Sequence, residues 1–279
     1  MTFVGIVTCN RPDFFYKCYD SIKKAKNVDC IAVCNDGSEE VKIDKEHIYI
    51  KHKQNKGVGI SKNELLKEAL KNKNINHIFL IEDDMIVKDP EVFNVYVKTA
   101  KKSGIYHLNF GPGSPFNRKQ DFVFDLHNRH ECKHDSALNP KMKIEYGDDI
   151  EVWLYEHSVA MLSYFHRSVL EKVGLHDEKF FNAWEHVDLT YRIIKAGFHP
   201  PFWWFADVGS SDRLIDVAPG AIEKSTIASD SEQWKKNVYG GREIYKQKHG
   251  HYPNQPPYVE KSEVVNIIKK LKSNREIIK

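Results

Sequence analysis

Short apolar runs alternate along the first part of the chain with stretches that have the apolar spacing of amphipathic helices. Residues 3–8, 31–34, 48–51 and 77–81 are rich in β-branched and aromatic residues and predict strands. The last of these runs is apolar throughout its middle, as expected for a strand that is covered on both faces. Strands that alternate with helices favour an α/β domain with a mostly parallel sheet.

Two helices are predicted between these strands. The first follows Pro12 and could be N-capped by Asp13. Its spacing predicts a buried face made of Phe14, Phe15, Cys18, Tyr19 and Ile22. The second begins at Ser61, after a glycine-bearing loop over residues 55–60. Its inward face is predicted to carry Leu65, Leu66, Ala69 and Leu70.

The pattern changes after Asn109, where a loop rich in glycine and proline covers residues 111–115. Residues 116–156 alternate short apolar stretches with polar, histidine-rich segments, which predicts irregular hairpins over the sheet. Further elements are expected beyond this region. They are strands at 158–165 and 202–205 and helices at 168–173, 185–196 and 262–278.

Polar side chains gather where three of the predicted strands end. Residues 8–11 read Thr-Cys-Asn-Arg, residues 35–38 read Asn-Asp-Gly-Ser, and residues 82–84 read Glu-Asp-Asp. Ligands of open α/β sheets bind beyond the carboxyl ends of the strands. These clusters are therefore predicted to line a binding site.

The acidic cluster at residues 82–84 is a candidate metal site. Adjacent carboxylates repel one another and are costly to desolvate, and a hard divalent cation relieves both costs because it prefers oxygen ligands. Alternate residues of a strand point the same way, so Glu82 and Asp84 share a side while Asp83 points away. Asp84 is the predicted ligand of a metal that also bridges substrate phosphates, and a solvated turn that only ends the strand is the alternative.

The formal net charge of +3, from 42 Lys and Arg against 39 Asp and Glu, is unevenly distributed. Residues 235–279 carry 11 basic and 4 acidic residues, a net charge of +7, which leaves −4 on the first 234 residues. The chain as a whole is therefore not a strongly basic nucleic-acid binder. Its 41% of hydrophobic residues is enough for a packed core.

Neither a membrane helix nor a secretory leader is predicted. No run approaches the roughly 18 apolar residues of a membrane helix, and residues 1–11 lack a basic leader followed by a long apolar segment. An odd number of cysteines without a disulfide framework favours reduced thiols in a cytoplasmic protein. These cysteines are Cys9, Cys18, Cys30, Cys34 and Cys132.

Five motifs occur in the order seen in nucleotide-sugar glycosyltransferases of the GT-A fold, and they most resemble the large family 2. The motifs are Thr-Cys-Asn-Arg-Pro at 8–12, Asn-Asp-Gly-Ser at 35–38, Asn-x-Gly with Ser-Lys-Asn at 55–63, Glu-Asp-Asp at 82–84 and Trp-Glu-His-Val-Asp-Leu at 184–189. The resemblance covers about residues 1–205 and implies a Rossmann-like mixed sheet flanked by helices. It also implies a donor-binding half at 1–110 and an acceptor-binding half of the same domain at 111–232. The charge distribution, and not the resemblance, marks a basic C-terminal extension at 233–279.

The resemblance assigns donor-binding roles to the strand ends. Thr8, Asn10 and Arg11 would line the pocket of the donor's base, and Asp36 would bind the base or the ribose. Asp83 would serve the nucleotide.

Further roles are implied for the helix start and the acidic cluster. Lys62 and Asn63 would face the nucleotide, with Gly57 and Gly59 allowing close approach. The family usually has Arg where this chain has Lys62, which turns a bidentate fork into a point charge. Asp84 takes the metal position of the family's Asp-x-Asp motif, with Glu82 at its first position. The expected metal is Mn2+ or Mg2+.

The acceptor-side motif departs from the family at the expected catalytic base. Many relatives read Glu-Asp, with the Asp as base, where this chain reads Glu185-His186. An imidazole, whose ordinary pKa is about 6.5, could remove the acceptor's hydroxyl proton. Glu185 and Asp188 lie on adjacent faces of the predicted helix, so they could meet one substrate while His186 turns away. We favour Glu185 as the base, ahead of Asp188 and His186.

Several other residues have two interpretations. Trp184 could stack on a sugar or pack in the core, and Asp188 with Arg192 could form an ordinary i,i+4 ion pair. Loop positions without metal contact are preferred over metal ligation for three candidates, namely His199, Asp207 and Asp212. One cluster has the ligand types of a zinc site but no common spacing, so a polar hairpin near the acceptor is preferred. It consists of His127, His130, Cys132 and His134.

These features predict transfer of a hexosyl or pentosyl group from a nucleotide diphosphate donor, with a UDP-sugar expected first, to an acceptor hydroxyl. Inversion is the family expectation. The acceptor would be a glycan, a wall polymer or a modified DNA base, because the basic extension could recruit an anionic polymer, DNA or an anionic lipid surface. A terminal helix packed on the body with a solvated lysine face is the simpler interpretation of this extension. A catalytically degenerate GT-A domain that only binds nucleotide or glycan is the alternative function.

Overall fold

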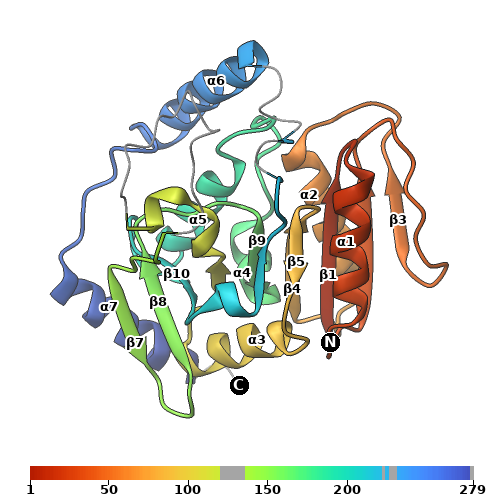
Figure 1. Cartoon of the computed structure of the whole chain (residues 1–279). Helices are drawn as coiled ribbons and strands as arrows, with labels where there is room; N and C mark the ends of the chain where they lie inside the picture. The colour runs from red at the N-terminus through yellow and green to blue at the C-terminus, as the bar shows by residue number, and fades with distance from the viewer. Residues whose placement is uncertain (120–135, 222–223, 226–230, 277–279) are drawn as a thin grey trace.

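The computed structural model describes residues 1–119, 136–221, 224–225 and 231–276. A six-stranded mixed sheet forms the centre, with helices on both faces (Figure 1). The strand order is β3-β2-β1-β4-β9-β6; the first four strands run parallel, and β9 runs antiparallel to both of its neighbours. The strands are β1 (Thr2–Thr8), β2 (Cys30–Asn35), β3 (Ile48–Lys51), β4 (His77–Glu82), β6 (His107–Asn109) and β9 (Leu162–His166).

Two hydrophobic cores sandwich this sheet. On β1, Val4 and Ile6 point into one core while Phe3 and Val7 point into the other, which explains why the strand is apolar without alternation. The first core is covered by α1 (Pro12–Lys23) and α3 (Val92–Ser103). The second is covered by α2 (Val58–Lys71), α4 (Arg167–Val173) and α5 (Glu185–Lys195). The predicted α/β architecture is therefore confirmed.

Two smaller antiparallel sheets flank the central one. The first joins β10 (Phe205–Val208), β8 (Glu151–Tyr155) and β7 (Met142–Glu145), and it contains the β7–β8 hairpin within the region where hairpins were predicted. The second joins β5 (Met85–Val87) to β11 (Ile215–Val217). Short 3-10 helices accompany them: η1 (Gly111–Gly113), η2 (Pro115–Asn117) and η4 (Ser211–Arg213).

Two helices end the described chain and lie well apart, with α6 at the top of Figure 1 and α7 at its lower left. The last helix, α7 (Lys261–Glu276), buries Val264, Ile268 and Leu271 in the first core while Lys269 and Lys272 stay exposed. This packing agrees with the simpler interpretation of the basic extension. The longer α6 (Ser231–His249) buries Tyr245. None of the helices among the described residues is long and apolar enough to cross a membrane.

Three predicted boundaries differ from the structure. The first helix begins at Pro12 with Arg11 at the N-cap, so Asp13 lies in the first turn and caps nothing; the fixed φ of proline suits the first helical position. The second begins at Val58, three residues before Ser61. The strand predicted at 158–165 starts only at Leu162 and ends at His166.

The strand predicted at 202–205 is also displaced, to Phe205–Val208. Trp203 has a positive φ of 71°, and the Trp204 backbone N–H closes a turn onto Pro201. The two indole N–H groups donate to the backbone carbonyls of Pro256 and Val259. This aromatic run therefore fastens the C-terminal segment to the body, a long-range role that a local apolar pattern does not reveal.

Candidate active site

Parallel pairing brings the predicted polar clusters to one edge of the sheet. Thr8 pairs with Asn35, and Val7 pairs with Glu82, so the three strand ends are level. A pocket of about 330 Å³ opens at this edge. Its lining includes six of the predicted donor-side or metal residues, namely Thr8, Asn10, Arg11, Asp36, Glu82 and Asp83.

Two members of the acidic cluster share one arginine, and they are Asp83 and Asp84, not the Glu82 and Asp84 pair that was predicted to share a side, because the chain turns directly after β4. The Arg11 guanidinium contacts Asp83 and lies 3.1 Å from Asp84 Oδ2, and Thr8 Oγ1 donates to Asp83 at 2.7 Å. Burial and the negative charge of Glu82 raise the pKa of Asp84 to about 7, despite the opposing charge of Arg11. The other oxygen, Asp84 Oδ1, is buried without a hydrogen-bond partner among the described residues. The cluster is therefore short of positive charge and of donors.

Asp36 holds the loop that leads into α2. Its carboxylate accepts from the backbone N–H groups of Lys56 and Gly57, each at 2.8 Å, and lies 2.7 Å from His52 Nδ1. The φ of Gly57 is 89°, and a Cβ there would lie 2.4 Å from the Phe181 carbonyl oxygen. Only glycine therefore permits this meeting of the donor-side and acceptor-side loops.

Asn10 organises the neighbouring loop. Its Oδ1 accepts hydrogen bonds from Ser38 N, Ser38 Oγ and Glu39 N. This contact presses Asn10 against Gly37, where a Cβ would lie 2.4 Å from Asn10 Oδ1. Asn10 thereby fixes the wall of the pocket as well as lining it.

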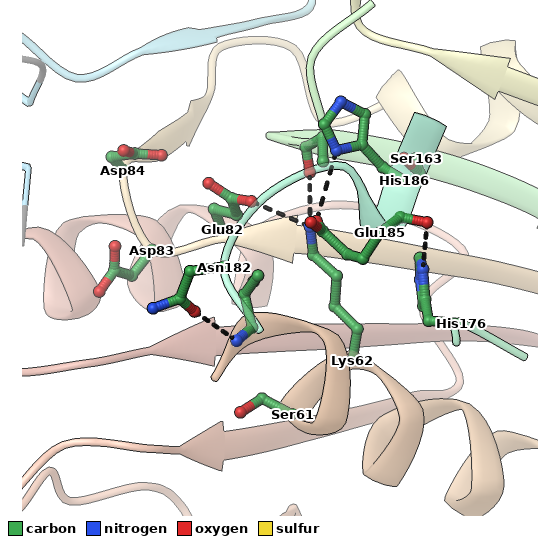
Figure 2. Close-up of polar contacts among 12 residues, drawn as sticks. Ser61, Lys62, Glu82, Asp83, Asp84, Ser163, His176, Asn182, Glu185 and His186 are labelled. Atoms are coloured by element: carbon green, nitrogen blue, oxygen red, sulfur yellow. Dashed lines mark hydrogen bonds and ion pairs between the residues drawn. The ribbon is translucent and has the colours of Figure 1, made fainter. Parts of the chain in front are cut away.

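Lys62 and Asn63 point away from this pocket, toward the acceptor-side segment. Lys62 Nζ lies 3.0 Å from Glu82 Oε1 and 3.4 Å from Glu185 Oε1, and Figure 2 shows the two carboxylates approaching the ammonium group from two sides. The Asn63 amide donates to the His176 carbonyl and accepts from the His176 N–H, both at 2.9 Å. Neither side chain lines the pocket, so their predicted contact with nucleotide stays a prediction.

The three candidate bases on α5 have different surroundings. The Glu185 side chain is 4% exposed and accepts from Lys62, whereas the His186 side chain is 22% exposed. Asp188 is fully buried and forms ion pairs with α5 and α6. Its partners are Arg192 at 2.9 Å, Lys248 at 2.9 Å and His249 at 2.8 Å. The expected i,i+4 pair with Arg192 exists, but it is part of a larger buried cluster.

Trp184 contacts α6. Its indole N–H donates to the Val238 carbonyl at 2.9 Å, and a Cβ at Gly241 would lie 2.7 Å from its ring. The ring thus packs on α6, which favours the packing interpretation over a free stacking surface. Its contact with an acceptor sugar stays a prediction.

Two of the remaining metal candidates are engaged by protein groups. Asp207 accepts from Tyr96, Gly111 and Ser211, and His199 Nδ1 lies 2.8 Å from the Pro200 carbonyl. At Asp212 it is the backbone carbonyl that accepts a hydrogen bond, from Lys88. Within the described ranges, no group of three or more His, Cys, Asp or Glu side chains is arranged to hold a metal ion. The predicted zinc cluster lies outside the described residues: His127, His130, Cys132 and His134.

One pocket-wall residue, Asn182, and one residue that supports the wall, His52, have no strong sequence signal. Asn182 Oδ1 accepts from the Val58 N–H at 2.9 Å, so an acceptor-side loop caps the first turn of α2 and completes the pocket. His52 orients Asp36 from the end of β3. Asn182 is an isolated polar residue among apolar ones and His52 stands in a long polar run, so only the tertiary structure connects either of them with the site.

This sheet, with its acidic strand end and its acceptor-side helix, is that of a GT-A glycosyltransferase. The sequence model of Glycosyl transferase family 2 matches residues 3–174, and the chain belongs to that family. Sequence comparison with curated proteins finds no match.

Solved structures share the fold at low sequence identity. Residues 1–349 of S. aureus TarS superpose with a TM-score of 0.50 and 11% identity, covering 99% of this chain and 71% of that one. The mannosyltransferase PcManGT from Pyrobaculum calidifontis, in complex with GDP-Man and Mn2+, gives 0.50 and 9%, covering 99% and 75%. GalNAc-T7 with UDP, GalNAc and Mn2+ gives 0.50 and 13%, covering 99% and 54%. The family and the fold support glycosyl transfer from a nucleotide sugar as the general activity.

Proposed function

We propose that the protein transfers a sugar from a nucleotide diphosphate donor to an acceptor hydroxyl, in a reaction that depends on a divalent metal held at Asp84. The observation that carries this proposal is the pocket at the strand ends of a family-2 chain, with Glu82 and Asp83 in its wall and Asp84 beside them, 3.1 Å from the pocket residue Arg11. A UDP-sugar is the first donor to test, although GDP-Man and UDP each accompany Mn2+ in the related folds.

The pocket offers the groups that a nucleoside would need. Asp36 is a hydrogen-bond acceptor for imino or hydroxyl groups of the base and ribose, and backbone N–H groups and His52 hold it in place. Asn10 and Thr8 would add polar contacts in the same wall. Arg11 would contact the donor from its position beside the acidic cluster.

The acidic cluster fits a divalent cation. Asp84 has one buried oxygen without a hydrogen-bond partner among the described residues, and its raised pKa reflects burial together with negative charge that Arg11 only partly neutralises. Such oxygen ligands suit Mg2+ or Mn2+, which usually complete their coordination with water and substrate phosphates. When bound, the cation would neutralise the charge that develops on the leaving diphosphate. Glu82 is turned to Lys62, so Asp84 is the main protein ligand in this proposal.

The protein would then contribute mainly by positioning the two substrates and by accepting one proton. The pocket would hold the nucleotide, and the acceptor-side helix would bring a hydroxyl to the sugar, with inversion expected if attack comes from the face opposite the diphosphate. A base from α5 would accept the hydroxyl proton. The acceptor is proposed to be a glycan, a wall polymer or a modified base of DNA.

A panel of nucleotide sugars with MnCl2 tests this function. Binding would be followed by thermal shift and turnover by release of the nucleoside diphosphate, with hydroxymethylated DNA among the acceptors. We expect turnover that EDTA abolishes and that Asp84→Asn lowers by about 100-fold or more. Full turnover in excess EDTA would refute the metal's role. Nucleotide binding without turnover of any donor would favour the degenerate binding module.

A further inference from the structure

A buried line of three ionisable side chains connects the donor-side helix α2 to the acceptor-side helix α5 (Figure 2). Lys62 Nζ lies 3.4 Å from Glu185 Oε1, and the same oxygen lies 3.4 Å from His186 Nδ1. Exposure increases along this line, from 2% for the Lys62 side chain to 4% for Glu185 and 22% for His186. Only its last member therefore reaches the surface.

The contact with Glu185 determines which nitrogen of the neutral His186 ring carries the hydrogen. An ionised carboxylate only accepts hydrogen bonds, so Nδ1 must carry the hydrogen that lies between the two side chains. The lone pair of the neutral ring is then on Nε2, for which the described structure contains no hydrogen-bond partner. A histidine oriented by a buried carboxylate in this way presents a proton acceptor to whatever binds beside it.

The other two candidate bases are less suited to the task. Although burial opposes the change, the charges of Lys62 and His186 lower the pKa of Glu185 below the ordinary carboxyl value, and so weak a base accepts a hydroxyl proton poorly. Asp188 is fully buried, and its oxygens are already paired with cations from two helices.

We infer that His186 is the general base of the transfer, that Glu185 orients its ring, and that Lys62 holds Glu185 in position. This inference rests on the proposed glycosyl transfer and reverses the order expected from the sequence, which placed Glu185 first. In the step, the acceptor hydroxyl gives its proton to His186 Nε2 while its oxygen forms a bond to the anomeric carbon. The bond from that carbon to the donor's phosphate oxygen breaks, and its electron pair leaves with the nucleoside diphosphate. In donor hydrolysis, water takes the place of the acceptor.

The other histidines that face His186 have lowered pKa values. Besides Glu185, the facing groups are His176 from the loop before α5, His107 from β6, and Lys62 through Glu185. Burial, with the charge of Lys62 added, lowers the pKa of His176 to about 4, and burial lowers the pKa of His107 well below its ordinary value. Neither of these rings should gain a proton near pH 6.5.

The test compares the wild type with two replacements of the base. Hydrolysis of UDP-glucose, UDP-GlcNAc and GDP-mannose is measured with MnCl2 as release of nucleoside diphosphate, and UDP binding is measured by calorimetry. We expect His186→Gln to lower kcat by about 100-fold or more, with the Kd for UDP unchanged within twofold. His186→Asp restores a base at the same place. It should remain within about tenfold of the wild type, and the decline of kcat/KM on the acid side should move to lower pH.

Glu185→Gln tests the orienting role without removing the ring. Loss of the carboxylate disfavours the imidazolium, so the acid-side decline of kcat/KM should move to lower pH. The histidine ring signals of 13C-labelled protein, assigned by their loss in His186→Gln, should titrate at lower pH in the Glu185→Gln variant. This spectroscopic readout requires no turnover.

The outcomes separate this inference from the proposed function. If the wild type hydrolyses a donor and His186→Gln keeps more than half of its rate, the assignment of the base is wrong and the glycosyl transfer stands. An acid-side decline that is the same in His186→Asp and in the wild type would also overturn the assignment. A wild type that binds UDP but hydrolyses none of the three donors would refute both proposals.

Discussion

The donor edge and the acceptor-side helix hold their buried carboxylates in opposite ways. At the donor edge, Asp83 and Asp84 share the single guanidinium of Arg11, and one oxygen of Asp84 has no hydrogen-bond partner in the described structure. On α5, Asp188 is paired with its helix neighbour Arg192 and with Lys248 and His249 of α6. One region has too little positive charge, and the other has more than enough.

This difference separates a ligand site from a structural clamp. Buried negative charge with insufficient counter-charge destabilises the ligand-free protein and creates affinity for a cation. A buried carboxylate with several partners instead fixes the elements that supply them, here the end of α6 against α5. Replacing each aspartate by its neutral isostere should therefore have opposite effects on stability.

The largest expected effect follows from Asp188→Asn, which leaves three cationic or polar groups beside a neutral amide. Breaking a buried ion pair from one side typically costs about 3–5 kcal/mol, and we expect the free energy of unfolding in urea to fall by about 3 kcal/mol. Asp177→Asn is the matched control, because Asp177 also pairs with Lys248 but is 24% exposed. That variant should lose no more than about 1 kcal/mol. Equal effects in the two variants would contradict the clamp.

The opposite effect is expected for Asp84→Asn in metal-free protein. Since the folded-state pKa of Asp84 is raised to about 7, ionisation favours the unfolded chain. The stability contributed by this group should fall as the pH rises from about 4 to about 7 and then stay level. In EDTA at pH 8 the variant should be more stable than the wild type by about 2–4 kcal/mol, and the difference should vanish near pH 4. A wild type that is equally stable or more stable at pH 8 would show that Arg11 already satisfies the cluster.

The donor edge could be predicted largely from the sequence, because its determinants are local. Each strand is a short apolar run, and the polar residues directly after it must lie at the carboxyl edge once the strands pair in parallel. Thr8, Asp36 and Asp83 reach the pocket for that reason. The helical spacing of apolar residues likewise predicted the buried face of α1.

The acceptor side could not be predicted in the same way, because its contacts join residues far apart in the chain. Glu185 and Asp188 look equivalent on a helix, yet Lys62 from α2 engages the first and Lys248 from α6 engages the second. Asn182 enters the pocket wall because Val58 needs a cap that its own segment lacks. Such partners are set by packing, and no local pattern encodes them.

A smaller effect is expected where the two regions touch, at Gly57. An alanine there would be strained by the φ of 89° and would also place its Cβ against the Phe181 carbonyl oxygen. We expect Gly57→Ala to lose about 2 kcal/mol of stability and to weaken UDP binding by loosening the loop around Asp36. Gly147→Ala is the control, since its φ is 77° and no atom lies within 4 Å of the added Cβ. It should lose only about 1 kcal/mol, and equal losses would mean that the two loops do not press on each other.

The smallest effect is expected on the lysine face of α7. Lys269 and Lys272 are exposed, whereas the helix is held by Val264, Ile268 and Leu271 in the core. The double variant Lys269→Gln/Lys272→Gln should therefore stay within about 0.5 kcal/mol of the wild-type free energy of unfolding. The residues that pack α7 and the residues that carry its charge are different, so this variant removes charge without disturbing the packing. It therefore also tests whether the lysines recruit an anionic acceptor. Weaker, less salt-dependent retention on heparin with unchanged stability would assign the lysines to such a surface, and unchanged retention would leave α7 with packing as its role.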